Sequence, residues 1–396
     1  MKGFVQKYRR TASDADNERQ GTEALAERQK IRPVMSESCG IAGCQHGASY
    51  EYIISFDALW DSALRCRINV SWKPSVKQFI NNLPLEILRM HERLEDGTWK
   101  NGRPHEIDIL YPKKRKGLSI RFPDRVYQRS INDNALYPEM TRHFIVGNCA
   151  CQEGKGTDFA LKLVLKYLRR HIINYGTEGW LVQVDIHGYY PNMVHEKVKE
   201  CFRRYIPWDV EQHIEEVLDQ QYVGDVGYNP GSQMVQIAGI SLLNQLDHKI
   251  KERLRQKSYL RYMDDFWNLC FRKEEAQMVL DYIVLHLKED YGLEVNEKKT
   301  HITPLIEGFR FLGFDFHIDP DGHIWITIDP ASVKHERKKI YRLASGVNSG
   351  KISEKKADEC ISAWYAHAAI GNSVRLIRRI NGYYINLRRT LVCQNP

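Results

Sequence analysis

The sequence lacks the features that direct a chain into a membrane or out of the cell. Its 396 residues include no apolar run of 18 or more, so no membrane-spanning helix is expected. The first ten residues, MKGFVQKYRR, have no apolar core of the kind found in secretory signal peptides. The nine cysteines are scattered rather than set at the spacings of a disulfide framework. These absences predict a cytoplasmic protein with no membrane partner.

Acidic residues are scarce mainly near the C-terminus. The formal net charge is +8, and residues 331–396 alone contain 13 Lys and Arg against 4 Asp and Glu. A basic segment of this kind indicates a phosphate-backbone partner, although a merely solvated helical face is the alternative. Hydrophobic and charged contents of 42% and 27% are typical of a globular protein, and the length allows two or three subdomains.

Three carboxylates stand beside apolar stretches that read as strands. The stretch Tyr259–Phe271, YLRYMDDFWNLCF, predicts a hairpin with Asp264 and Asp265 at its turn. Asp-Asp is also an ordinary turn dipeptide, so the pair alone decides little. The apolar run 181–186 carries one further acid, Asp185, which is unfavourable to bury unless it is paired or bound to a metal. Together they predict a catalytic site for two Mg²⁺ ions, with Mn²⁺ as the alternative metal.

A basic turn follows the first alternating segment of the chain. Residues 105–112 and 118–122 alternate as strands, and KKRKG at 113–117 joins them. Such a hairpin can fold over an incoming nucleotide and neutralise its triphosphate, with Arg115 and Lys116 as candidate nucleotide contacts. The alternative is a solvated basic turn.

Hydrophobic periodicity predicts most of the remaining elements. A hairpin is expected over 308–329, and three helices are expected from Ser332 onward. Helices are also predicted over 157–175, 194–205 and 274–291, and a single long helix is predicted to follow the Gly/Pro turn at 227–231 and run to about 250.

With these motifs in this order, the sequence resembles bacterial reverse transcriptases of the group that includes group II intron, retron and diversity-generating retroelement enzymes. YMDD resembles their YxDD motif, and Asp185 with Tyr190 resembles their first catalytic motif. The resemblance implies an α+β right-hand polymerase with fingers, a palm built on a central antiparallel sheet, and a helical thumb. The implied domains are a flexible N-terminal extension at 1–45, fingers and palm at 46–330, and a basic helical thumb at 331–396.

The resemblance implies three further positions near the nucleotide. The ring of Tyr190 would lie under the sugar and clash with a 2′-hydroxyl, so that dNTPs are preferred over NTPs. The Asp-Arg pair ending at Arg125 resembles the motif that follows the fingers hairpin. The segment 231–236 resembles the xGxxxSQ motif of diversity-generating enzymes and ends in Gln236, but Val235 departs from that pattern.

The resemblance also implies contacts with primer and template. Lys299 lies in a segment, LEVNEKKTHIT, that resembles the family's strand-and-lysine motif, and Gly313 lies in FLGF, which resembles the primer grip. Arg375, Arg378 and Arg379 lie in the segment that resembles the thumb.

The implied activity is that of an RNA-directed DNA polymerase, a nucleotidyltransferase that makes cDNA from an RNA template and dNTPs. The expected template is a cognate structured noncoding RNA, in a retroelement or an antiphage-defence system, with an accessory protein or a second copy of the chain as a further partner. Two alternatives remain open. One is a nucleic-acid-binding scaffold that has lost catalysis, and the other is a template-independent or RNA-synthesising polymerase.

Overall fold

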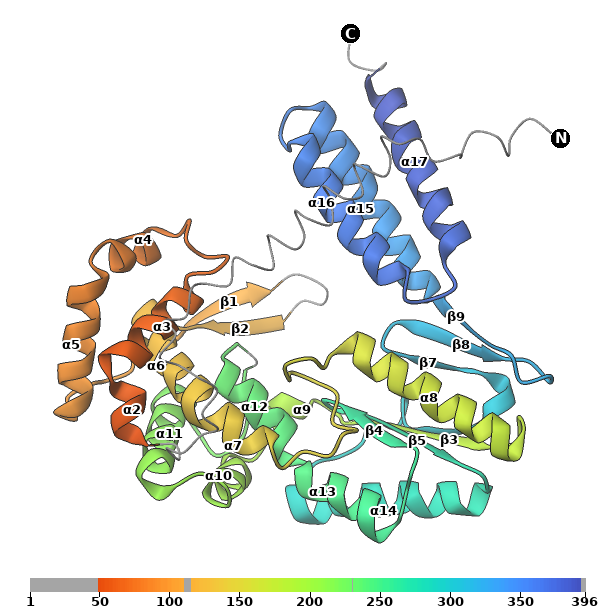
Figure 1. Cartoon of the computed structure of the whole chain (residues 1–396), viewed down its shortest axis with the longest axis horizontal. Helices are drawn as coiled ribbons and strands as arrows, with labels where there is room; N and C mark the ends of the chain where they lie inside the picture. Colours follow the sequence, from red (N-terminus) through yellow and green to blue (C-terminus); the bar gives the residue numbers. More distant parts are fainter. Residues whose placement is uncertain (1–48, 110–114, 230, 393–396) are drawn as a thin grey trace, which may run out of the picture. The chain divides into compact units, whose positions relative to one another are not determined.

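The computed structural model describes residues 49–109, 115–229 and 231–392. The predicted N-terminal extension, 1–45, lies outside this part of the chain, and so do Lys113 and Lys114. Helices and antiparallel strands are mixed along the rest of the chain, which confirms the predicted α+β class (Figure 1). No helix in the described ranges has the length and apolar character needed to cross a lipid bilayer.

The strands form three antiparallel sheets. They are β1 (His105–Ile109), β2 (Arg115–Ser119), β3 (Trp180–Asp185), β4 (Tyr259–Tyr262), β5 (Asp265–Cys270), β6 (His301–Pro304), β7 (Phe309–Phe311), β8 (Phe314–Ile318) and β9 (Ile324–Ile328). The helices are α2 (Tyr50–Ile54), α3 (Phe56–Cys66), α4 (Pro74–Asn81), α5 (Leu83–Glu95), α6 (Phe122–Ile131), α7 (Tyr137–Thr141), α8 (Thr157–Tyr175), α9 (Tyr189–Asn192), α10 (His195–Arg203), α11 (Trp208–Gln221), α12 (Gln233–Leu242), α13 (Asn244–His248), α14 (Lys273–Tyr291), α15 (Pro330–Asn348), α16 (Glu354–Ala368) and α17 (Val374–Val392).

The central sheet has four strands in the order β4-β5-β3-β6. Its strands come from the predicted apolar stretches, whose successive side chains point to opposite faces. Val182, Val184 and Phe266 pack in the same core as α14, whereas Leu181 and Trp267 pack in a second core with α8. Both faces of this sheet are therefore covered, and the acidic residues stand at the ends of its strands.

The second core continues from the central sheet into the C-terminal helices. The sheet β7-β8-β9 contributes Phe311, Phe314 and Phe316, all buried. Strands β8 and β9 form the hairpin predicted over 308–329, but a further turn at Leu312-Gly313 adds β7 as a third strand. Ile340 of α15 and Trp364 of α16 pack in the same core, and α17 adds further apolar side chains. The three predicted C-terminal helices are thus anchored to the sheet through shared apolar packing.

The N-terminal helices belong to the first core. Helices α2 to α6 bury residues such as Ile53, Leu59, Ile87 and Val126, which pack in one cluster with α10, α12 and α14. The two-stranded sheet β1-β2 extends from this region and confirms the predicted hairpin.

Two predicted elements differ in detail. Strand β2 already begins at Arg115, which pairs with Ile109, so Arg115 and Lys116 belong to a strand rather than to the turn. The single long helix predicted to run to about residue 250 is instead broken at Leu243 into α12 and α13 and then continues as a π-helical turn at Lys249–Arg253. Sequence periodicity does not detect such a break, because apolar residues continue on both sides of it.

Candidate active site

Three carboxylates meet where β3 ends and β5 begins. Asp185 is the last residue of β3 and lies directly opposite Asp265, the first residue of β5, in the antiparallel register. Asp264 precedes Asp265 in the turn that joins β4 to β5. Asp185 is buried, and the other two are half-buried. The fold therefore brings together the three residues that were predicted to be catalytic.

The segment after α14 contacts Asp185 on its backbone and its side chain. Asn296 Nδ2 donates a hydrogen bond of 3.0 Å to Oδ1, and Lys299 Nζ lies 2.6 Å from Oδ2. The main-chain N–H of Asn296 also donates to the carbonyl of Asp185 at 2.7 Å. Hydrogen bonding to Asp185 raises the pKa of Lys299. Lys299, predicted to bind primer or template, thus lies against a carboxylate of the acidic cluster.

The pKa values of two carboxyl groups in the cluster are raised by burial and by the charges of the neighbouring carboxylates. Burial, followed by repulsion from Asp264 and Asp185, raises the pKa of Asp265 to about 7. Burial also raises the pKa of Asp264, and the charge of Asp185 adds to that shift. A divalent cation would remove both causes, because it ligates the desolvated oxygens and cancels their charge. Three carboxylates are also the donor set that hard cations such as Mg²⁺ prefer, so these residues fit the predicted metals.

A second group of potential metal ligands lies in the turn between β8 and β9. Three candidate ligand atoms lie within 4.8 Å of one another in this turn, from Asp319, Asp321 and His323. Within the described ranges no other group of residues meets this spacing, and the carboxylates around Asp185 are therefore farther apart. Here the main-chain N–H of His323 donates to Asp319 at 2.8 Å, and the two side chains also contact each other. These hydrogen bonds account for the close spacing as part of an exposed hairpin turn.

A buried ion pair lies directly beneath the acidic turn. Arg261 of β4 and Asp247 of α13 are both 0% exposed and pair through two contacts, Nη2–Oδ2 at 2.6 Å and Nε–Oδ1 at 2.8 Å. The hydroxyl of Tyr259 donates to the same carboxylate at 2.5 Å. Burial alone would lower the pKa of Arg261, but the facing carboxylate of Asp247 raises it, so Arg261 stays charged.

This ion pair reaches the backbone of the acidic turn. Arg261 Nη1 donates to the carbonyl of Met263 at 2.7 Å, and Nη2 donates to the carbonyl of Ile240 at 2.9 Å. Met263 precedes Asp264 and has a φ of 56°, a left-handed conformation that costs a residue with a side chain roughly 1–3 kcal/mol. Arg261 therefore supports the strained residue that sets the direction of Asp264. This role was not predicted from the sequence, although an arginine inside an otherwise apolar strand indicates a buried charge that needs a partner.

Tyr190 lies in α9. Gly188, in the short link between β3 and α9, precedes this helix in the left-handed conformation (φ 54°). A Cβ atom added at Gly239 of α12 would lie 2.8 Å from the Tyr190 hydroxyl, so the ring packs directly against that helix. The hydroxyl is buried and has no hydrogen-bond partner among the described groups. Burial raises its pKa, so it stays protonated and can donate.

Gln236 and Arg125 line different cavities. Gln236 lies in a cavity of about 370 Å³ together with Arg129 and Cys151. Cys151 Sγ lies 4.0 Å from the sulfur of Met263, so this cavity reaches the acidic turn. Arg125 lines a separate cavity of about 700 Å³ near the β1-β2 hairpin. The structure thus brings Gln236 toward the carboxylates and places Arg125 in a different cavity, which residues of the hairpin also line.

The other predicted residues are spread over three elements. The backbones of Arg115 and Lys116 lie in β2, but their side chains are outside the described part of the structure. Gly313 forms the turn between β7 and β8 with Leu312, and both have positive φ, 84° and 48°. Such a two-residue turn matches the twist of the flanking strands and favours glycine. The arginines of the C-terminal helix, Arg375, Arg378 and Arg379, are exposed on α17.

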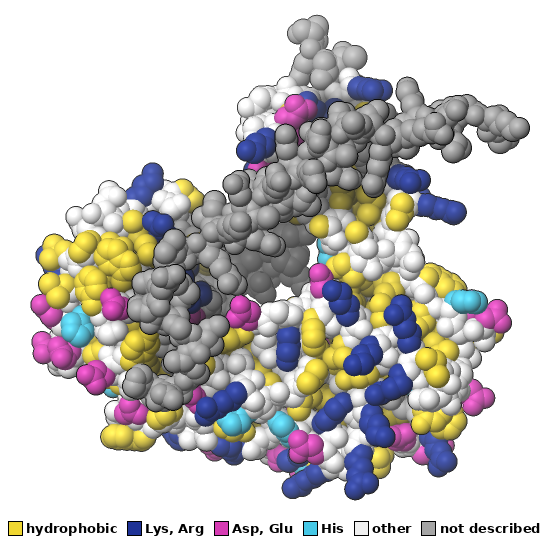
Figure 2. All heavy atoms as spheres, in the orientation of Figure 1, with side chains coloured by type: hydrophobic (Ala, Val, Ile, Leu, Met, Phe, Trp, Pro, Cys, Tyr) yellow, Lys and Arg dark blue, Asp and Glu magenta, His cyan; other side chains and the backbone are white. Residues whose placement is uncertain are grey.

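A further basic surface lies outside the predicted sites. Lys and Arg side chains gather over α8 in Figure 2, and Lys162, Lys166, Arg169 and Arg170 are exposed on that helix. Hydrophobic periodicity identifies only the apolar face of this helix, so the sequence does not predict this surface.

A family model described as reverse transcriptase (RNA-dependent DNA polymerase) matches residues 118–316, which is half of the chain and includes all three carboxylates. Telomerase from Candida albicans, solved in complex with a TWJ fragment of telomeric RNA, is similar at 11% identity and a TM-score of 0.43, over 74% of this chain and 61% of that chain. Apo telomerase from Candida tropicalis is similar at 12% identity and a TM-score of 0.44, over 74% and 62% of the two chains. The chain therefore spans about three fifths of the telomerase chains. No curated protein matches the sequence.

Proposed function

Because the chain belongs to the reverse transcriptase (RNA-dependent DNA polymerase) family, we propose that it copies RNA into DNA. It has the right-hand polymerase fold of that family, built from helices and antiparallel sheets. The observation that carries the proposal is the pairing of Asp185 with Asp265 across β3 and β5, with Asp264 in the adjoining turn. Nucleotidyl transfer needs such an acidic site, because it proceeds largely through positioning and charge stabilisation. The substrates would be dNTPs, and the product would be DNA paired with its RNA template.

The three aspartates would hold two Mg²⁺ ions, or Mn²⁺ in their place. When bound, these ions would activate the primer 3′-hydroxyl and stabilise the departing pyrophosphate. The chain's own residues prepare the site: Asn296 and Lys299 contact the two carboxylate oxygens of Asp185 and fix its orientation. Arg261 supports the turn that carries Asp264.

Five residues are proposed to bind the incoming nucleotide. Tyr190, whose ring packs against Gly239 of α12, would lie under the sugar and exclude a 2′-hydroxyl. Gln236 would contact the nucleotide from the cavity next to the acidic turn. The cations proposed to meet the triphosphate are Arg115, Lys116 and Arg125.

The primer and the template are proposed to bind along the C-terminal half of the chain. Gly313, whose added Cβ would meet nothing within 4 Å, would let the backbone approach the primer. Lys299 would act beside Asp185, close to the primer end. Arg375, Arg378 and Arg379 would neutralise phosphates from α17.

The proposed organisation is a flexible extension at 1–45, fingers and palm at 46–330, and a thumb at 331–396. The shared core between β7-β9 and the C-terminal helices supports a thumb that is anchored to the palm. The proposed setting is the cytoplasm, in a retroelement or an antiphage-defence system, with a structured noncoding RNA as template and an accessory protein or a second copy of the chain as partner.

Primer extension on an RNA template tests the proposal. Asp264→Asn removes a ligand charge and almost no volume, and it should lower the rate of dNTP addition about a thousandfold or more, equivalent to about 4 kcal/mol. Asp321→Asn, in the exposed β8-β9 turn, is the matched control and should leave extension unchanged. Near-normal extension by Asp264→Asn would refute the assignment of the acidic cluster.

The same assay separates the alternatives. A wild-type protein that binds RNA but adds no nucleotide with Mg²⁺ or Mn²⁺ would indicate a scaffold that has lost catalysis. Extension that ignores the template sequence would indicate a template-independent enzyme. Equal use of NTPs and dNTPs would indicate an RNA-synthesising one.

A further inference from the structure

A groove of about 870 Å³ runs along α11 and is lined mainly by polar and charged side chains. The carboxylates of this acidic groove are Glu211, Glu215, Glu216 and Asp219. Arg203 of α10 is the one cation among the described residues that line it, and Lys199 pairs with Asp219 from outside the groove at 2.7 Å. The acidic groove therefore keeps an excess of negative charge in a chain whose formal net charge is +8.

One carboxylate of the acidic groove lacks a full set of partners. Glu211 is 6% exposed, and its Oε1 atom has no hydrogen-bond partner among the described groups. Arg203 Nε lies 3.3 Å from that oxygen, but the other two nitrogens of Arg203 pair at 2.5 Å with Glu196 and Glu215. Burial, together with the neighbouring Glu215, raises the pKa of Glu211 to about 7. A further cation in the groove would offset both causes.

An exposed tryptophan stands beside these carboxylates. Trp208, the first residue of α11, lines the acidic groove and is 75% exposed. The face of an indole ring attracts the charged ends of Lys and Arg side chains, and their apolar stems pack on the same ring. Carboxylates next to an open indole ring therefore fit a surface that presents Lys and Arg.

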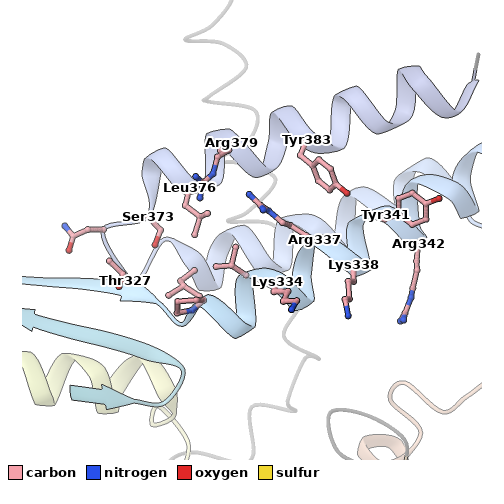
Figure 3. Close-up of a pocket in the computed structure, with 14 residues that line it drawn as sticks. Thr327, Lys334, Arg337, Lys338, Tyr341, Arg342, Ser373, Leu376, Arg379 and Tyr383 are labelled. Carbon is pink, nitrogen blue, oxygen red and sulfur yellow. The ribbon is translucent and has the colours of Figure 1, made fainter. Parts of the chain in front are cut away.

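A nucleic acid does not fit the acidic groove, because its phosphates would meet carboxylates. The groove between α15 and α17 has the opposite character, since its lining includes Lys334, Arg337 and Arg379 (Figure 3). Arg379 is among the residues proposed to neutralise phosphates, so the two grooves suit different partners. The partner of the acidic groove is therefore a polypeptide with a basic surface.

The chain itself carries such a surface on α8. Lys and Arg side chains gather over this helix in Figure 2, and the exposed ones that form this basic stripe are Lys162, Lys166, Arg169 and Arg170. Arg170 donates to the Ser258 hydroxyl at 3.0 Å, and within the described ranges no ion pair neutralises any of the four cations. The basic stripe can therefore meet an acidic partner without breaking an existing ion pair.

The acidic groove and the basic stripe match in length. Two rows of charge repeat at every fourth position, namely Lys162, Lys166 and Arg170 on α8 and Glu211, Glu215 and Asp219 on α11. Residues four apart lie on the same side of a helix, and eight positions span about 12 Å. The two helices pack in different cores, and no ion pair in the described part of the chain joins them. One copy of the chain therefore leaves the two surfaces unpaired with each other.

We propose that the acidic groove of one copy of this chain binds the basic stripe of a second copy. The carboxylates of α11 meet the cations of α8, and a cation of the stripe lies on the ring of Trp208. Contacts in which one surface meets a different surface of another copy occur in two-fold dimers and in rings. This contact rests on the proposed function only for the choice of a second copy as partner, and it requires no catalysis.

Sedimentation velocity with the full chain tests this contact. Protein at about 1–50 µM covers the range in which an interface with a Kd of about 1 µM assembles. Assembly is expected at about 0.05 M salt and should be lost at about 1 M salt, where screening acts over about 3 Å. Treatment of the protein with nuclease beforehand excludes assembly through bridging RNA.

Charge reversal then identifies the two surfaces. Glu216→Lys with Asp219→Lys changes only exposed residues of the acidic groove, and Lys162→Glu with Lys166→Glu does the same for the basic stripe. Each double variant alone should assemble about tenfold or more weakly than the wild type, because like charges would face each other. An equimolar mixture of the two should assemble again, since each variant keeps the surface that the other has lost.

Further variants provide the controls. Asp61→Lys with Lys355→Glu reverses two exposed charges on α3 and α16, outside both surfaces, and should leave assembly unchanged. Trp208→Ala should weaken assembly by about two- to fivefold, and Trp208→Phe should keep part of that difference because it retains an aromatic face.

Several outcomes would overturn this contact between copies. These are a wild type that stays monomeric throughout, a mixture of the double variants that does not assemble, or an equal loss of assembly in the control. Loss of RNA binding instead of assembly in the basic-stripe variant would assign α8 to nucleic acid. Primer extension on the same preparations separates the contact from the proposed function. An inactive wild type that assembles as expected would refute the polymerase alone, and an active wild type that stays monomeric would refute the contact alone.

Discussion

The buried pair of Arg261 and Asp247 provides the sharpest test of how the acidic turn is held. Asp247→Asn leaves the shape of the side chain nearly unchanged but leaves the Arg261 charge without its counter-ion in a site with 0% exposure. Breaking a buried pair by removing one partner costs roughly 3–5 kcal/mol of folding free energy. Since native proteins are stable by only roughly 5–15 kcal/mol, urea unfolding should detect the change clearly.

A double variant separates stability from positioning. Arg261→Met together with Asp247→Asn removes both charges, and the amide oxygen still accepts from Tyr259, so most of the lost stability should return. The carbonyl of Met263, however, would no longer receive the hydrogen bond of 2.7 Å that supports its left-handed conformation. Primer extension by the double variant should therefore stay reduced by about tenfold or more, equivalent to about 1.4 kcal/mol.

The two measurements must be made on the same preparations. Asp61→Asn, an exposed acid on α3, is the control and should change the free energy of unfolding by no more than about 0.5 kcal/mol. If the double variant recovers both stability and full extension, Arg261 is a purely structural residue and the positioning argument fails. If Asp247→Asn is as stable as the wild type, the pair is not buried as described.

Three further predictions concern the sugar, the carboxylate contact and the C-terminal helix. Tyr190→Ala should raise ribonucleotide incorporation by roughly ten- to two-hundredfold while dNTP addition continues, as measured by single-nucleotide extension with dGTP and GTP. An unchanged ratio of GTP to dGTP incorporation would contradict the proposal that Tyr190 excludes the 2′-hydroxyl. Lys299→Gln should raise the Mg²⁺ concentration needed for half-maximal extension, because the Asp185 carboxylate, 2.6 Å from Lys299, loses a charge-assisted hydrogen bond that orients it. An unchanged Mg²⁺ dependence would show that this contact does not orient Asp185. Replacing Arg375, Arg378 and Arg379 by Gln should lower the slope of log K against log salt by roughly 0.7–0.9 per lost phosphate contact, and an unchanged slope would assign these arginines to packing.

The sequence by itself determined the local elements of the acidic site. The apolar and aromatic composition of the stretches around Asp185 and around the pair Asp264-Asp265 predicted β3, β4 and β5, because such side chains suit buried and half-buried strands. The helix predicted over 274–291 ends where expected as α14, because Gly292 after it adopts the left-handed conformation with φ 67°. Each of these features depends on neighbours within a few residues, which is the range over which propensity and periodicity act.

Contacts between distant segments were decided by tertiary structure alone. Lys299 reaches Asp185 across 114 positions of sequence, and nothing near Lys299 distinguishes it from Lys298 as the partner. The break that separates α12 from α13 and the pairing of Asp247 with Arg261 likewise depend on how α13 packs against β4. Such partners are selected by burial, since a charge removed from water must find its counter-ion wherever the folded chain places one.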